Sequence, residues 1–114
     1  MKSITLNVEL PSIDELEQSF ASNYEGMFIS SADSGKIKFY SIEKYYKRIG
    51  TELGGFVFIE SLEGSSYFIQ IWVIGGRSSQ LRVDYGAQEH FAKEMQDLIT
   101  SHASRVTQVE TLLE

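Results

Sequence analysis

The stretch Tyr67–Ile74 constrains the fold of this chain more than any other part of the sequence. A β-strand places alternate side chains on opposite faces of a sheet. One row here is apolar throughout and comprises Tyr67, Ile69, Ile71 and Val73. The other row is nearly as apolar and comprises Phe68, Gln70, Trp72 and Ile74. Both faces of this strand therefore need cover, from helices, loops, a cavity or a second subunit.

The N-terminal part of the sequence predicts a strand followed by a short helix. Residues 3–10 alternate between apolar and polar side chains, which is typical of a strand with one solvent-exposed face. Pro11 ends this strand. Ser12 and Glu15 then form a capping-box pattern, which predicts a helix that runs to about Ser22.

Turn residues divide the middle of the chain into further strands. Strands are predicted at residues 27–29, 36–49, 56–62, 67–74 and 80–84. The turn signals between them are Asp33-Ser34-Gly35, Glu63-Gly64-Ser65-Ser66 and Gly75-Gly76-Arg77-Ser78-Ser79. Short connections of this kind favour an antiparallel sheet.

Beyond Gly86, apolar residues recur at steps of three and four, which predicts one long amphipathic helix over 87–113. Such a helix would be about 40 Å long, against a diameter of about 26 Å for a domain of this size. Its last turns would overhang the sheet, and their apolar residues would favour a partner chain; these are Val106, Val109 and Leu113.

These elements predict one domain over residues 1–114, of the α+β class. The expected architecture is a two-layer sandwich, with an antiparallel sheet of about five to six strands covered on one face by a short N-terminal helix and a long C-terminal helix. The absence of Cys excludes disulfides and thiolate-ligated metals. A net charge of −6 opposes a broad nucleic-acid surface. We expect no signal peptide, no membrane span and a cytoplasmic location.

The stretch from about Glu43 to Ile99 resembles an uncharacterised family of small bacterial domains of unknown function. The residues that carry this resemblance are Glu43-Lys44-Tyr45-Tyr46, Arg48, Gly75-Gly76, Asp84-Tyr85-Gly86-Ala87 and Phe91. Tyr85 stands where the family pattern has Trp. The resemblance implies a compact α+β domain and no particular activity.

Several motifs offer both a chemical and a structural interpretation. Asp84-Tyr85-Gly86-Ala87 can hold an anion at a helix start or simply cap the helix, and capping is favoured. Gly75–Ser79 has the parts of an anion nest but lacks a Gly-Lys-Ser/Thr ending, so a hairpin turn is favoured. His90 and His102 lie about 18 Å apart along one predicted helix, too far apart to share a metal. We therefore expect no metal, no cofactor and no catalytic residues.

The segment 36–48 combines five basic residues and one acidic residue with interleaved tyrosines. It can offer stacking rings and phosphate contacts to single-stranded nucleic acid. The favoured interpretation is a solvent-exposed strand face whose lysines protect a sheet edge against aggregation, because the rest of the chain is acidic.

The leading hypothesis is a non-enzymatic binding or assembly domain that forms homo-oligomers, with a dimer favoured, through the second apolar sheet face and the C-terminal helix. The alternative is a carrier for an apolar or amphipathic small molecule in a pocket between sheet and helix. Its ligand-binding residues would be Phe68 and Trp72, with Arg77, Arg82 or Asp84 at the pocket mouth. An enzyme ranks third, because the sequence shows no cluster of titratable groups.

Overall fold

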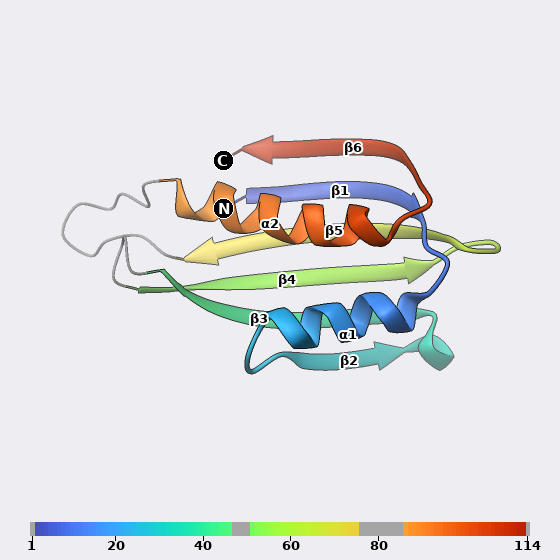
Figure 1. The fold of residues 1–114 in the computed structure, drawn as a ribbon, viewed down its shortest axis with the longest axis horizontal. Helices are drawn as coiled ribbons and strands as arrows, with labels where there is room; N and C mark the ends of the chain where they lie inside the picture. The colour runs from blue at the N-terminus through green and yellow to red at the C-terminus, as the bar shows by residue number, and fades with distance from the viewer. Residues whose placement is uncertain (1, 47–50, 76–85, 114) are drawn as a thin grey trace.

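Six strands and two α-helices make up the part of the chain that this computed structural model describes, which is residues 2–46, 51–75 and 86–113. In chain order the elements are β1 (Lys2–Glu9), α1 (Ile13–Asn23), β2 (Phe28–Ala32), a 3-10 turn η1 (Asp33–Gly35), β3 (Ile37–Tyr46), β4 (Thr51–Ser61), β5 (Ser66–Gly75), α2 (Ala87–His102) and β6 (Arg105–Leu113). The strands pair antiparallel in the order β2-β3-β4-β5-β1-β6 (Figure 1). The predicted α+β class with an antiparallel sheet is confirmed.

The first and last strands lie side by side in this sheet. β1 pairs with β5 on one side and with β6 on the other, so that Lys2 lies opposite Leu113. At the other end of this pair, the backbone N–H of Ser104 donates to the carbonyl oxygen of Glu9 at 2.9 Å. The two ends of the chain therefore lie close together (Figure 1).

Two hairpin turns lie where the turn residues predict them. Between β4 and β5, the N–H of Leu62 donates to the carbonyl oxygen of Ser66 at 2.9 Å. Gly64 in this turn has a φ of 68°, a conformation that glycine adopts without steric cost. Between β2 and β3, the chain reverses through Asp33–Gly35. Both hairpin predictions are confirmed.

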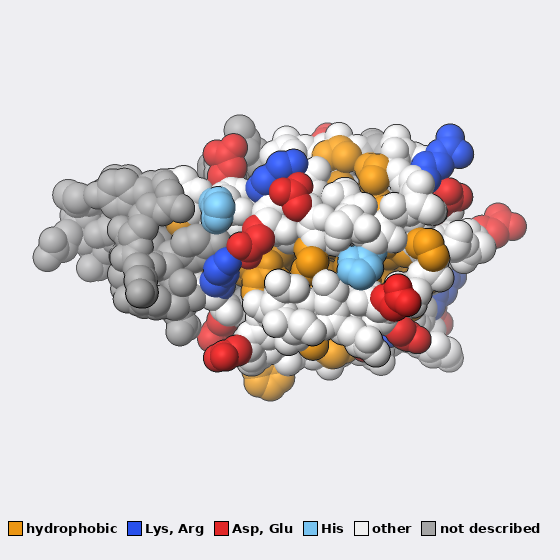
Figure 2. Space-filling view, in the orientation of Figure 1, with side chains coloured by type: hydrophobic (Ala, Val, Ile, Leu, Met, Phe, Trp, Pro, Cys, Tyr) orange, Lys and Arg blue, Asp and Glu red, His pale blue; other side chains and the backbone are white. Residues whose placement is uncertain are grey.

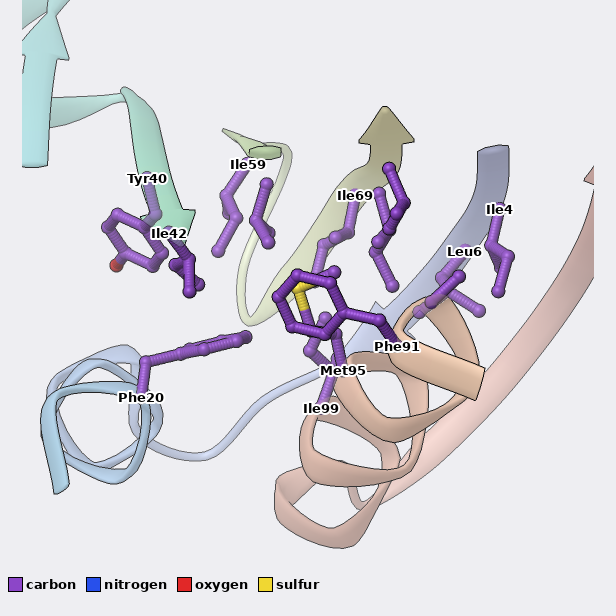
Figure 3. Close-up of a cluster of buried hydrophobic side chains, with 14 of the residues drawn as sticks. Ile4, Leu6, Phe20, Tyr40, Ile42, Ile59, Ile69, Phe91, Met95 and Ile99 are labelled. Carbon is purple, nitrogen blue, oxygen red and sulfur yellow. The ribbon is translucent and has the colours of Figure 1, made fainter. Parts of the chain in front are cut away.

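Both α-helices lie in front of the sheet in Figure 1. Figure 3 shows Phe20 of α1 and Phe91 of α2 directed toward the sheet, where they meet side chains that include Tyr40 and Ile69. Alternate residues of the central strands face this layer and are at most 4% exposed: Ile4, Leu6, Val8, Leu53, Val57, Ile59, Ile69, Ile71 and Val73. The hydrophobic core therefore lies between the sheet and the two helices.

Gly55 of β4 lets α2 approach the sheet closely. A Cβ atom at this position would lie 3.0 Å from the ring of Phe91 and 3.1 Å from Cε of Met95. Both neighbours are fully buried, so they have little freedom to move away. A strand glycine of this kind marks a close approach by another element.

The C-terminal region differs from the predicted helix over 87–113. α2 ends at His102, Ala103 has extended backbone, and Arg105–Leu113 form β6. This segment contains two Val and two Thr residues, which favour strands, and β1 provides an edge with which it pairs. The prediction of one long helix that overhangs the sheet is therefore wrong.

A β-bulge explains why β6 resembles a helix in the sequence. Val106 lies opposite Val8 and Gln108 lies opposite Asn7, so that Thr107 is an extra residue in β6. The extra residue puts Val106 and Val109 on the same face of the strand although they are three residues apart. A spacing of three is also the spacing of neighbours on one side of a helix.

Part of the predicted arrangement lies outside the described residues. This part includes the strand at 80–84, the turn residues 76–79 and the junction residues Asp84 and Tyr85. The structure describes the chain again from Gly86, and α2 begins at Ala87.

Candidate functional site

The face of the sheet opposite the helices carries a group of large apolar side chains. Alternation along each strand, with the buried residues facing the helices, assigns eight large apolar side chains among the described ones to this opposite face. We call this group the aromatic face; it comprises Phe28, Ile37, Phe39, Phe56, Phe58, Phe68, Trp72 and Ile74. Phe28 is 75% exposed, Ile74 42% and Phe39 39%, and the other five are partly buried.

The rings of the aromatic face form a connected cluster across three strands. Phe39 of β3 lies opposite Phe58 of β4, and Phe56 of β4 lies opposite Trp72 of β5. The rings of Phe39 and Phe56 stack diagonally, with centroids 5.7 Å apart and planes 29° apart. Cross-strand aromatic pairs of this kind stabilise the sheet, and they hold the rings in one arrangement before any partner binds.

The other half of the same sheet face is polar. Thr5, Asn7 and Glu9 of β1 point to this side, because Ile4, Leu6 and Val8 face the helices. Arg105 of β6 lies opposite Glu9 and Glu110 opposite Thr5, so both belong to the same polar half. Among the described side chains, the apolar part of this face is therefore confined to β2, β3, β4 and β5.

Two glutamates flank the aromatic face along the strands. Glu60 follows Phe58 on β4 and lies opposite Phe68, while Glu43 lies on β3 beyond Phe39, opposite Gly54. Among the described residues assigned to this sheet face, Arg105 is the single cation, and it lies on the distant strand β6. The electrostatic surroundings of the aromatic face are therefore acidic.

The structure describes two of the five residues that the sequence predicts for a ligand site. Phe68 and Trp72 lie on the aromatic face and not between the sheet and the helices, because Ile69, Ile71 and Val73 occupy the helix side of β5. Arg77, Arg82 and Asp84 lie outside the described residues. The predicted interface residues Val106, Val109 and Leu113 all belong to β6, and the side chain of Leu113 is not described.

On the helix side, Tyr40 forms part of a polar cluster that the sequence did not predict. Its hydroxyl donates to Oε1 of Glu17 at 3.0 Å, and Nζ of Lys38 lies 3.2 Å from the same oxygen. Burial raises the pKa of the Tyr40 phenol far above its ordinary value, and the nearby Glu17 carboxylate adds to this shift. Tyr40 therefore stays protonated and acts as a fixed hydrogen-bond donor.

Glu94 of α2 forms a second cluster with a similar composition. Its carboxylate accepts from the hydroxyl of Tyr24 at 2.7 Å and from Nζ of Lys44 at 2.6 and 2.8 Å. Nζ of Lys44 also lies 5.9 Å from the ring centroid of Tyr24 and 6.0 Å from that of Phe91. Tyr24, Lys44 and Glu94 line a shallow cleft of about 350 Å³ beside Asp97.

Both clusters join strand β3 to the helices through ion pairs. The segment 36–48 therefore directs Lys38, Tyr40 and Lys44 toward α1 and α2, and not toward solvent at a sheet edge. The interpretation of these lysines as edge guards is wrong, because α1 and α2 offer them carboxylate partners. Alternation along β3 does put the three residues on one face, but their glutamate partners are 21 to 50 residues away in sequence.

A second hollow lies between α2 and β6. Its volume is about 390 Å³, and Ile4, Ala92, Val109 and Thr111 line it together with Glu89, Lys93 and Gln96 of α2. Figure 2 shows hydrophobic side chains gathered along the edge of the molecule over β6. Val106 and Val109 are 41% and 48% exposed. The helix-side face of β6 is thus only partly covered.

The described residues contain no group of three or more His, Asp or Glu side chains that could hold a metal ion. His90 and His102 lie near opposite ends of α2. Neither α-helix in ranges 2–46, 51–75 and 86–113 has the length and apolar character that a bilayer crossing requires.

No protein-family model matches this sequence, and no curated protein shows significant similarity to it. The resemblance of residues 43–99 to a bacterial domain family stays a sequence-based prediction.

Proposed function

We propose that the chain is a two-layer α+β sandwich that serves as a non-enzymatic binding domain and associates with a second copy through its aromatic face. The observation that supports this proposal is the cluster formed by Phe39, Phe56, Phe58 and Trp72 on the sheet face opposite the helices. Contiguous exposed apolar patches are rare on monomers and mark interaction sites.

Sheet packing provides a physical route for this association. Two sheets that pack face to face lie about 10 Å apart, with strands inclined by about 30°, and their inner side chains interdigitate. In a two-fold arrangement, the same aromatic residues of both copies would meet at the centre. The inclination separates the strand ends, so that Glu43 and Glu60 would remain in solvent.

The acidic surroundings argue against nucleic acid as the occupant. Aromatic side chains on an open sheet can stack on single-stranded bases, but such sites also need cations that contact phosphates. The glutamates beside the aromatic face, Glu43 and Glu60, would repel a phosphate backbone. The face therefore favours an apolar protein surface.

The proposal can be tested with the fluorescence of Trp72, which is the single Trp of the chain. Its emission maximum should shift to shorter wavelength as protein concentration rises, because association removes water from the indole. Sedimentation velocity over the same concentrations should show a rise in mass. A monomer whose emission is constant up to high micromolar concentration would refute the proposal.

A matched pair of variants locates the interface. Phe39→Lys places a charge in the aromatic face and should abolish the emission shift, together with the part of the mass increase that this face produces. Thr5→Lys places the same charge on the same side of a central strand, but in the polar half, and should leave both unchanged. Circular dichroism checks that each variant is folded. Equal effects of the two variants would contradict the proposed location.

A small-molecule carrier is the second candidate function. The hollow between α2 and β6 supports it, because its volume of about 390 Å³ and its mixed lining fall within the range of ligand sites. Native mass spectrometry of the purified protein should then show a bound adduct that Ala92→Trp, which fills the hollow, removes. An adduct that persists in this variant would exclude this hollow as its site.

A further inference from the structure

Strand β6 presents an unpaired edge that differs from the other edge of the sheet. The opposite edge strand, β2, has five residues and leads directly into the turn η1. β6 has nine residues, and one of its two edges pairs with β1 while the other has no partner among the described strands. Long unpaired edges are ready templates for pairing with another strand, whereas short ones are protected.

The residues of β6 have a self-complementary order around Gln108. On one side of it the strand carries Val106 and then Arg105, and on the other side Val109 and then Glu110. The bulge at Thr107 places both valines on the helix side and both charged residues on the opposite side. Without the extra residue, Val106 and Val109 would point to opposite faces, and so would Arg105 and Glu110.

We propose that β6 pairs antiparallel with β6 of a second copy, about a two-fold axis that passes between their Gln108 residues. With Thr107 as an extra residue in both strands, as it is in the pairing with β1, Val109 lies opposite the Val106 of the other copy and Glu110 lies opposite its Arg105. Both pairs occur twice because of the symmetry. The six described strands of each copy join into one continuous sheet, and the contact is independent of the aromatic face.

Charge and burial favour a second copy over another protein as the occupant. The register pairs each Arg105 with a Glu110 and each Val106 with a Val109. Two copies of this short segment therefore complement each other in charge and in apolar surface. Val106 and Val109 are 41% and 48% exposed within one chain. Pairing would cover part of both side chains while it satisfies the outer backbone groups of β6.

The charge pair gives a direct test. Glu110→Arg would place two arginines opposite each other twice across the interface, while inside its own chain position 110 faces the uncharged Thr5. We expect the dimer dissociation constant to rise at least about tenfold, since two attractive pairs become two repulsive ones. Arg105 lies opposite Glu9 within its own chain, so adding Arg105→Glu together with Glu9→Arg keeps that pair oppositely charged and should restore most of the affinity. Failure of this rescue, or no loss with Glu110→Arg, would overturn the proposed register.

Introduced thiols test the same register by geometry, since the chain contains no Cys. Residues directly opposite each other in an antiparallel pair are close enough for a disulfide. The double variant Val106→Cys and Val109→Cys should therefore form a covalent dimer under mild oxidation, whereas Val109→Cys alone should not. Equal cross-linking of both variants, or none in either, would contradict the register.

Mass measurements distinguish the β6 contact from the contact through the aromatic face. If both contacts form, the wild-type chain assembles beyond a dimer, Phe39→Lys leaves a dimer held by β6, and Glu110→Arg leaves a dimer held by the aromatic face. A wild-type dimer that is sensitive to Glu110→Arg but not to Phe39→Lys would support the β6 contact and refute the aromatic one. The reverse pattern would refute the β6 contact alone.

Discussion

At the scale of single residues, Tyr40 shows how a buried polar group is accommodated. Its side chain is fully buried, and its hydroxyl donates to Glu17 of α1 at 3.0 Å. Its ring packs edge-on against Phe20 of the same helix, with centroids 5.7 Å apart. One residue therefore contributes an apolar ring and a satisfied donor to the contact between β3 and α1.

Tyr40 should make the stability of the fold fall at high pH. Burial raises the pKa of its phenol above the ordinary value of about 10. Above about pH 10 the phenol of the unfolded chain loses its proton, whereas the phenol of the folded chain keeps it. The free energy of unfolding therefore declines by at most about 1.4 kcal/mol per pH unit. Tyr40→Phe should weaken this decline, and at pH 7 it should cost about 0.5–1.5 kcal/mol for the lost hydrogen bond.

Denaturant titrations of the wild-type and Phe variants between pH 8 and pH 11.5 measure this difference. The two chains differ only at position 40, so the difference between their stability curves reports on this residue. Parallel stability curves for the two proteins would contradict the expected role of Tyr40.

At the scale of elements, α1 begins as its sequence predicts. Ser12 has extended backbone, and its Oγ accepts from the backbone N–H of Glu15 at 3.2 Å. Asp14 and Glu15 in the first turn add favourable charge at the positive end of the helix dipole. The helix then buries Leu16 and Phe20 against the sheet.

Removal of this cap should destabilise the protein measurably. Ser12→Ala leaves the N–H of Glu15 without its side-chain partner and should cost about 0.5–2 kcal/mol. Ser12→Asp keeps an acceptor oxygen and should stay within a few tenths of a kcal/mol of the wild type. Thermal and urea unfolding of the three chains provide the values. A loss in the Asp variant as large as in the Ala variant would show that the cap is not the cause.

At the scale of the whole molecule, contacts between the two end regions of the chain complete one side of the sheet. β1 lies between β5 and β6, and Lys2 is opposite Leu113. The pairs between β1 and β6 join residues that are 96 to 111 positions apart, so their formation must overcome a large loop-closure entropy. The strand pairs β3–β4 and β4–β5 are local by comparison.

A circular permutant should therefore keep the fold. A short Gly/Ser linker can join the two present ends, because Lys2 and Leu113 are paired neighbours (Figure 1). New ends between Gly64 and Ser65 would open the exposed β4–β5 turn. Far-UV circular dichroism should match that of the wild type, and unfolding should remain cooperative. A permutant that is unfolded would indicate that the β4–β5 hairpin must be covalently continuous.

Local patterns in the sequence determined most of the individual elements, because alternation, caps and turn residues act over a few neighbouring positions. Strand β1, the capped helix α1 and the Gly64 turn follow from such patterns, as do the two apolar rows of β5. Tertiary structure decided the pairing of β6 with β1, because a bulge at Thr107 gives this strand the spacing of a helix. It also decided that Lys38 and Lys44 meet Glu17 and Glu94, since the approach of distant elements fixes which charges become partners.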